Sequence, residues 1–153
     1  RMTQLNGGQF KNGQMSRSGH PYAAFDILAD SGTPVAAITE GKVVHIGSDK
    51  CGGALLAVYN EKIGVTVAYL HTSVSRTIVK EGDAISEGQV IGYVGSAGEG
   101  CGTVHLHIDA NDTPKRIGCK RESCPAENQA HFQAGADKLQ LPQKLYENYM
   151  KLP

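Results

Sequence analysis

The 153-residue chain has no tryptophan, only three phenylalanines and no excess of charge of either sign. Fifteen lysine and arginine residues balance fifteen aspartate and glutamate residues. This balance argues against the basic field with which proteins attract nucleic acid or anionic lipid. The longest apolar runs, such as ALLAVY at 54–59, are too short to cross a bilayer. We therefore expect no nucleic-acid partner and no membrane span in this chain.

The N-terminal stretch RMTQLNGGQF lacks the apolar segment of a secretion signal. Because the numbering begins at an arginine, we expect a processed or trimmed chain from which an export signal has been removed. A parent protein with a pro-segment or a targeting domain is compatible with this expectation.

The four cysteines include no CxxC pair, which argues against a four-thiolate zinc knuckle. An even set of this kind favours two disulfides over structural zinc or free thiols. The local sequence favours a bond between Cys119 and Cys124, which closes CKRESC and leaves Cys51 and Cys101 for the second bond. Two disulfides would indicate an oxidising, extracytoplasmic compartment.

Between residues 22 and 109, short β-like runs alternate with turn signals, a pattern typical of an all-β fold. YNEKIG at 59–64 is polar and ends in glycine, as expected of a hairpin connection. The expected strands are AAFDILA, PVAAI, GKVVHIGS, ALLAVYNE, VTVAYLHT, QVIGYVG and TVHLHIDA.

Composition divides the chain into three parts. Residues 1–19 are polar and rich in Gly, Asn and Gln, and we expect a flexible lead-in there. The β domain is expected at 20–112. Residues 113–153 are expected to form a disulfide-bearing extension packed on the core, loop-like at first and closed by a short helix within 141–153. The apolar face of that helix would contain Leu145, Tyr149 and Leu152.

The segment GTVHLHIDA places two of the six histidines two positions apart in an apolar run. In a strand, residues i and i+2 point to the same side, so His105 and His107 would share one face while Leu106 and Ile108 face the core. Their Cα atoms would lie roughly 7 Å apart, which lets both imidazoles approach one metal ion. Two exposed histidines on a solvated strand face would give the same pattern.

Other candidate donors lie elsewhere in the chain. His20 and Asp26 flank a Pro–Tyr turn in SGHPYAAFDI, and His71 ends the run VTVAYLH. An imidazole and a carboxylate, joined to a His-x-His strand, make a donor set that zinc accepts. Taken alone, these residues could be a loop histidine, a turn-capping aspartate and an exposed strand-end histidine. His45, which alternation places on the side of Val43, is expected to be structural.

In their order and intervals, these segments resemble the zinc endopeptidase domain of the lysostaphin/LytM/LasA type, the M23 peptidases, which cut peptidoglycan peptides. The resemblance covers roughly residues 18–111 and implies a small domain of two facing antiparallel sheets with a zinc groove at one end. It is carried by GHPYAAFDI, SGTPVAAITEGKVVHIG, VAYLHTS, VKEGDAISEGQVIGYVGSAGEGCG and TVHLHI.

The resemblance also implies roles for five side chains. His20, Asp26 and His107 would be the zinc ligands, and His71 and His105 the two unligated histidines beside the metal. Many family members have three residues between the first histidine and the aspartate, whereas HPYAAFD has five. Longer spacings also occur in the family, so His20 remains the expected first ligand.

The implied activity is zinc-dependent hydrolysis of peptide bonds in peptidoglycan stems or cross-bridges, through a zinc-activated water. His105 would take or relay the proton of this water, and His71 would stabilise the oxyanion or protonate the leaving amine. The sequence leaves the division of roles between the two histidines open, and it does not indicate which bond is cut. LasA-like members also support a Cys51–Cys101 disulfide.

Three other interpretations fit parts of the sequence. A catalytically inactive module of the same fold, which binds cell-wall peptide or a partner hydrolase, would usually lack ligands that this chain keeps. VKEGDAISEGQVIGYV also resembles biotinyl and lipoyl domains, but the chain has no lysine in the motif that those domains modify. A structural zinc or copper β-sandwich would have a closed coordination shell.

Overall fold

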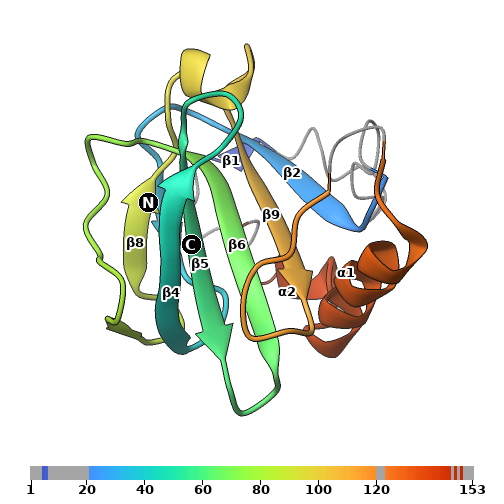
Figure 1. Cartoon of the computed structure of the whole chain (residues 1–153). Helices are drawn as coiled ribbons and strands as arrows, with labels where there is room; N and C mark the ends of the chain where they lie inside the picture. Colours follow the sequence, from blue (N-terminus) through green and yellow to red (C-terminus); the bar gives the residue numbers. More distant parts are fainter. Residues whose placement is uncertain (1–4, 7–20, 120–122, 146, 148, 150–153) are drawn as a thin grey trace.

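A computed structural model describes residues 5–6, 21–119, 123–145, 147 and 149. The strands form two antiparallel sheets, as the sequence predicts (Figure 1). The smaller sheet pairs β3 (Pro34–Ala36) with β8 (Val90–Tyr93). The larger sheet has the order β1 (Leu5–Asn6), β2 (Ala24–Ala29), β9 (His105–Asn111), β6 (Val65–Thr72), β5 (Ala54–Asn60), β4 (Gly41–Ser48) and β7 (Ala84–Ile85).

The seven strands expected from the sequence all occur, because alternating side chains and turn residues are local signals. The two-residue strands β1 and β7 were not expected. β1 pairs with Leu28 and Ala29 of β2 and falls within the expected lead-in at 1–19. The rest of that lead-in lies outside the described residues, as does Leu152.

The hydrophobic core lies between the two sheets. Val35 and Ile91 from the smaller sheet and Leu56 and Tyr69 from the larger one are fully buried in the same cluster. The Tyr69 hydroxyl accepts a hydrogen bond from the backbone N–H of Ile38 at 2.9 Å, which satisfies a buried polar group at the sheet interface.

β9 is the strand that positions the histidines, because it lies between β2 and β6. Leu106 and Ile108 are fully buried in the core, as alternation predicts. On β2, Asp26 lies opposite His107, and on β6, Leu70 does. His71 follows Leu70 on β6. Asp26 on β2, His107 on β9 and His71 on β6 are therefore brought together by three neighbouring strands.

The alternation argument was wrong for His45. The pairing of β4 with β5 shifts between Val43 and His45, so the regular alternation breaks at Val44. Val43 is buried in the core, whereas the His45 side chain is 58% exposed and lies 3.7 Å from the Glu81 carboxylate. The bulge therefore removes His45 from the buried side of the strand.

The extension after β9 contains a helix that the sequence analysis missed, α1 (Ala126–Lys138). A second helix, α2 (Gln143–Leu145), lies within the segment expected to form the closing helix. Leu145 and Tyr149 are fully buried, in agreement with the expected apolar face. The part of the chain that the structure describes has no helix long and apolar enough to cross a membrane.

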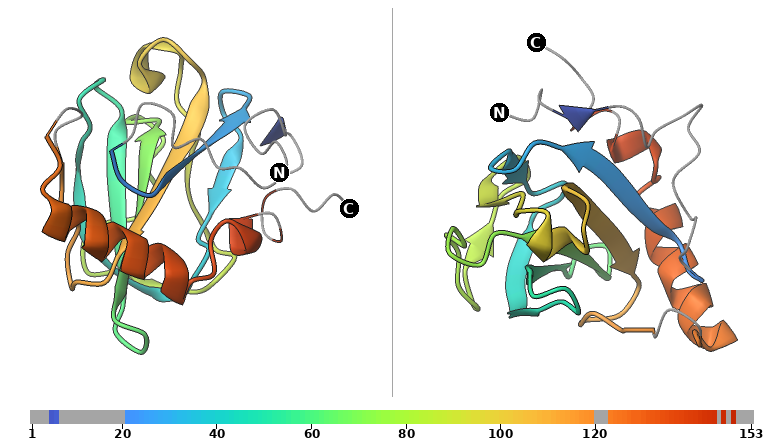
Figure 2. Two further views of the ribbon diagram at one scale, coloured as in Figure 1. Left: turned by 90° about the vertical axis from the view of Figure 1, so that its right-hand side faces the viewer. Right: turned by 90° about the horizontal axis from the view of Figure 1, so that it is seen from above.

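α1 lies across β9 and supports it from outside (Figure 2). Phe132 stacks on Tyr22 with ring centroids 4.2 Å apart. Gly135 approaches the β9 backbone so closely that an added Cβ would lie 2.5 Å from the carbonyl carbon of Ala110. The extension is thus held by a close helix–strand contact.

Both expected disulfides are present, Cys51–Cys101 and Cys119–Cys124. The first joins the loop after β4 to the loop before β9, and the second lies just before α1. The structure therefore supports the interpretation of the cysteines as disulfides rather than free thiols.

The close contact at Gly135 predicts whether a substitution there raises or lowers the free energy of unfolding. Helix propensity alone would make Gly135→Ala stabilising by about 1 kcal/mol. Because the methyl group would collide with backbone rather than with a flexible side chain, we expect the variant to be destabilised by about 1–3 kcal/mol in urea unfolding. Gln133→Ala, on the exposed side of α1, should change the free energy of unfolding by less than about 0.5 kcal/mol. A more stable Gly135→Ala variant would contradict the close packing.

Candidate metal site and groove

A groove of ≈ 640 Å³ contains four of the five side chains singled out in the sequence. Asp26 comes from β2, His71 from β6, and His105 and His107 from β9. The fifth, His20, lies outside the described residues. Three strands and the loops around Asp49 and Cys101 form the walls.

Asp26 and His107 are the two predicted ligands that the structure describes. Asp26 Oδ1 lies 3.4 Å from His107 Nδ1 and 3.8 Å from His105 Nε2. The His107 side chain is only 3% exposed. The cross-strand pairing of residues 26 and 107 produces this proximity, because directly paired residues in an antiparallel sheet point to the same face.

The two histidines predicted to be unligated lie beside this pair. The ring centroid of His71 lies 4.6 Å from that of His105 and 5.9 Å from that of His107. His71 has a left-handed backbone conformation, with φ at 67°, which is uncommon for a residue other than glycine. Strained backbone of this kind is often retained at functional sites.

His107 is oriented by the buried carboxylate of Asp109. Its Nε2 donates to Asp109 Oδ2 at 2.9 Å, and Arg116 binds the same carboxylate through Nη2 at 2.7 Å and Nε at 3.3 Å. The Asp109 side chain is completely buried. With Nε2 carrying the proton, Nδ1 of the neutral ring is the nitrogen that faces Asp26, and it is the nitrogen that can bind a metal.

The electrostatics of this group favour positive charge at His107. Burial alone lowers the pKa of His107, but the carboxylates of Asp109 and Asp26 outweigh burial and raise it above the usual value. Burial alone would also raise the pKa of Asp109, yet Arg116 and His107 lower it to about 2. Two carboxylates that contact one imidazole thus create an environment suited to a cation.

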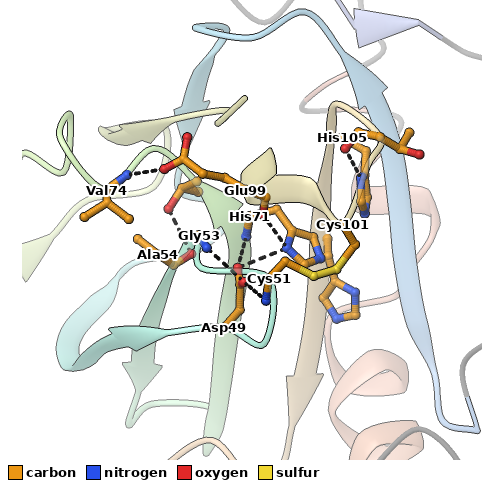
Figure 3. A network of polar contacts seen from close by, with 12 residues as sticks. Asp49, Cys51, Gly53, Ala54, His71, Val74, Glu99, Cys101 and His105 are labelled. Atoms are coloured by element: carbon orange, nitrogen blue, oxygen red, sulfur yellow. Dashed lines mark hydrogen bonds and ion pairs between the residues drawn. A yellow bond between two sulfur atoms is a disulfide. The ribbon is translucent and has the colours of Figure 1, made fainter. Parts of the chain in front are cut away.

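His71 and His105 are held differently at Nδ1. His71 Nδ1 lies 3.0 Å from Asp49 Oδ2 and 3.1 Å from the Glu99 backbone carbonyl (Figure 3). Burial lowers the pKa of His71, and the Asp49 carboxylate acts in the opposite direction. His105 Nδ1 lies 2.9 Å from the Thr103 backbone carbonyl. Both rings therefore have Nδ1 occupied by an acceptor.

The described donors fit zinc. Ligand atoms about 2.0–2.1 Å from a tetrahedral zinc ion lie roughly 3.3 Å apart. The 3.4 Å separation of Asp26 Oδ1 and His107 Nδ1 matches that value. One carboxylate and one imidazole, with a second imidazole expected from His20, form a catalytic donor set that leaves a fourth position for water or substrate.

A second cluster of potential donors does not fit. Cys51, His71 and Cys101 bring ligand atoms within 4.8 Å of one another. The two sulfur atoms are bonded to each other in a disulfide, and zinc binds cysteine as the thiolate. In the oxidised chain, this cluster is therefore a cross-link beside His71.

A family model for peptidase family M23 matches residues 20–118. The chain belongs to peptidase family M23. The match includes all five candidate site residues, namely His20, Asp26, His71, His105 and His107, so the candidate site lies within the M23 domain.

Curated relatives match a smaller part of the M23 chain. The glycyl-glycine endopeptidase ALE-1 of Staphylococcus capitis is 37% identical over 92 residues, which is 60% of this chain and 25% of the relative. Lysostaphin of Staphylococcus simulans is also 37% identical over 92 residues, with 60% of this chain and 18% of the relative covered. This chain thus spans no more than a quarter of the length of either relative.

Among solved structures, that of LytU is similar over almost the whole chain. The match covers 99% of this chain and 94% of that one, with 25% identity and a TM-score of 0.62. The similarity supports the LytM/lysostaphin-type fold beyond the segment matched by the family model.

The sequence analysis missed three polar residues of the M23 domain that orient the histidines. Asp109 continues the alternation of His105 and His107, so strand parity could have indicated it. Arg116 lies in a loop and Asp49 in a turn after β4. No local pattern connects either residue to its histidine, because these contacts join separate segments.

The Asp109–Arg116 pair predicts a large effect on stability. Arg116→Gln leaves a buried carboxylate short of its partner, so we expect the free energy of unfolding to fall by about 3–5 kcal/mol. Asp109→Asn combined with Arg116→Gln removes both charges and should cost less than the sum of the single changes. Urea unfolding in the presence of a chelator separates this effect from metal binding.

The matched control is Lys62→Gln, which removes an exposed ion pair with Glu40 and should leave the unfolding midpoint unchanged. Additive effects of the two single substitutions at Asp109 and Arg116 would show that the pair is not coupled.

Proposed function

We propose that this M23 chain is a zinc-dependent endopeptidase that hydrolyses peptide bonds in peptidoglycan stems or cross-bridges. The observation that carries the proposal is the convergence of Asp26 and His107 with His71 and His105 in one groove. Family membership supports peptidoglycan hydrolysis as the general activity. The inactive-module alternative explains the fold but gives no reason for two further histidines beside the ligand pair.

The proposed zinc ligands are His20, Asp26 and His107. Asp109 would keep His107 in the tautomer that directs Nδ1 towards Asp26, and an orienting carboxylate of this kind also raises the basicity of a ligand histidine. When bound, zinc supplies a Lewis acid that polarises the scissile carbonyl and lowers the pKa of water.

His71 and His105 are the proposed catalytic residues. With Nδ1 of each ring bound to an acceptor, each neutral ring has an unprotonated Nε2. One such nitrogen can accept a proton from the attacking water and later pass it to the leaving amine, while the other ring can donate a hydrogen bond to the oxyanion when its own Nε2 is protonated.

Wall peptides are the proposed substrate class. ALE-1 is named a glycyl-glycine endopeptidase, and its similarity to this chain supports a peptide bond as the target. Membership of family M23 supports peptidoglycan as the polymer that contains this bond. A groove of ≈ 640 Å³ has room for a segment of peptide on either side of the reacting carbonyl. Any pro-segment or targeting domain would belong to the parent protein.

We further propose that the protein acts outside the cytoplasm. Two disulfides connect the described cysteines, and such bonds persist in oxidising compartments. The proposed catalytic domain at 20–112 depends on the extension at 113–153, because α1 packs on β9 and Arg116 binds Asp109.

Substitution of single groove residues tests the division between ligands and catalytic residues. Asp26→Ala and His107→Ala should abolish both stoichiometric zinc binding and peptidoglycan cleavage. His71→Ala and His105→Ala should retain zinc and lower cleavage roughly 10²–10⁴-fold. Zinc content is measured by mass spectrometry of the metal. Cleavage is measured by digesting purified sacculi of several wall types and analysing the released fragments, which also identifies the bond.

His45→Ala is the matched control, because His45 is an exposed histidine on β4 outside the groove and its loss should affect neither measurement. If the zinc-loaded wild type releases no fragment from any wall type, and His107→Ala behaves identically, the inactive-module interpretation replaces the enzyme.

A further inference from the structure

A single buried carboxylate holds both the backbone and the ring of His71. Asp49 Oδ2 accepts a hydrogen bond from the His71 backbone N–H at 2.9 Å and lies 3.0 Å from its ring Nδ1. The Asp49 side chain is only 2% exposed. Because the backbone of His71 is left-handed, with φ at 67°, these two contacts fix the direction in which the ring leaves the end of β6.

The loop around Asp49 is built to keep this carboxylate in place (Figure 3). Its second oxygen, Oδ1, accepts the backbone N–H groups of Cys51 at 2.8 Å and Gly53 at 3.0 Å. Cys51 is covalently joined to Cys101. A Cβ at Gly53 would lie 2.8 Å from Asp49 Oδ2, so the close approach of the loop requires glycine at this position.

These contacts determine the tautomer of His71. The neighbours of Nδ1 are Asp49 Oδ2 at 3.0 Å and the Glu99 backbone oxygen at 3.1 Å. A carboxylate and a carbonyl can only accept hydrogen bonds, so Nδ1 carries the proton. The other ring nitrogen, Nε2, is then the one that can accept a proton from a reactant.

His105 has the same tautomer but a different partner. Its Nδ1 lies 2.9 Å from the backbone carbonyl of Thr103. A ring that accepts a proton becomes a cation, and a charge-assisted hydrogen bond to a carboxylate stabilises that cation more strongly than a bond to a carbonyl does. The two histidines beside the predicted ligands are therefore not equivalent.

We propose that Asp49 is a positioning residue that fixes His71 in the Nδ1–H tautomer and makes His71, rather than His105, the residue that carries the proton during peptide hydrolysis. This inference rests on the proposed endopeptidase function. Nε2 of His71 accepts a proton from water as the water oxygen bonds to the peptide carbon. It donates that proton to the departing amine as the C–N bond breaks, so the ring ends neutral.

Asp49→Asn in the full-length, zinc-loaded chain tests the proposal. With the amide oxygen retained by the N–H groups of Cys51 and Gly53, the amide NH2 would replace Oδ2. It would no longer accept the His71 backbone N–H, and it would face Nδ1 and require that nitrogen to act as an acceptor. We expect nitrogen-15 NMR of labelled histidines to show His71 shifted towards the Nε2–H tautomer, with the signal assigned by comparison with His71→Gln. The kcat on a wall peptide should fall roughly 10²–10⁴-fold, with KM and zinc content unchanged.

Glu81→Gln is the matched control. Glu81 Oε2 also accepts a backbone N–H, that of Ile46 at 2.9 Å, and lies near a histidine, His45 at 3.7 Å, but both side chains are exposed. This variant should leave the tautomer of His71 and the kcat unchanged.

Several results would overturn the proposal. A His71 ring that remains Nδ1–H in Asp49→Asn would show that the Glu99 carbonyl alone fixes the tautomer. A shifted tautomer with wild-type kcat would exclude His71 as the proton carrier, and loss of zinc would show that Asp49 acts through the metal site. If the wild type cuts no wall peptide, the proposed function fails, while the NMR comparison still decides whether Asp49 positions His71.

Gly53→Ala provides a second test should Asp49→Asn fail to fold. The variant keeps the carboxylate, but the added Cβ would lie 2.7 Å from the Glu99 backbone oxygen and 2.8 Å from Asp49 Oδ2, so both acceptors of His71 Nδ1 would have to shift. We expect a loss of kcat of at least about 10-fold with zinc retained, because small misplacements of a proton-transfer group are costly. Wild-type kcat in this variant would contradict the proposal.

Discussion

The position of β9 between β2 and β6 is the constraint on which the rest of the molecule depends. Leu106 and Ile108 are fully buried on one side of this strand, so a shift of one residue would move them to the groove side and place His107 and Asp109 in the apolar core. The same register holds His107 opposite Asp26. Burial of apolar side chains thus determines the separation of the Asp26 carboxylate and the His107 imidazole.

Much of the fold could be predicted from the sequence because its signals are local. Period-two alternation and glycine-ended turns identify the seven longer strands. The exceptions depend on tertiary contacts. The bulge at Val44 in β4 reverses the side on which His45 lies, and α1 buries only a narrow surface that includes Phe132, Gly135 and Ala136. A helix with so few apolar positions is recognisable only with the strand that it covers.

Only some residues of the candidate site could be predicted from the sequence. Strand parity and the order of the family's segments indicate the histidines and Asp26, which are the groups closest to the chemistry. Of the two carboxylates that orient them, Asp109 continues the alternation of His105 and His107, whereas Asp49 lies in the loop after β4, where no local pattern connects it to His71. Two imidazoles that look alike in the sequence acquire different partners, a carboxylate for His71 and a carbonyl for His105, only after the chain has folded.

The contact between α1 and β9 shows that the family match ends before the packed domain does. The family match ends at residue 118, yet Phe132 and Gly135 lie beyond it and pack against Tyr22 and the backbone of Ala110. A shortened protein that stopped at residue 118 would uncover the ring of Tyr22 beside the groove and the side of β9 that α1 covers. The segment matched by the family model is therefore smaller than the packed domain, whereas the similarity to the LytU structure extends over almost the whole chain.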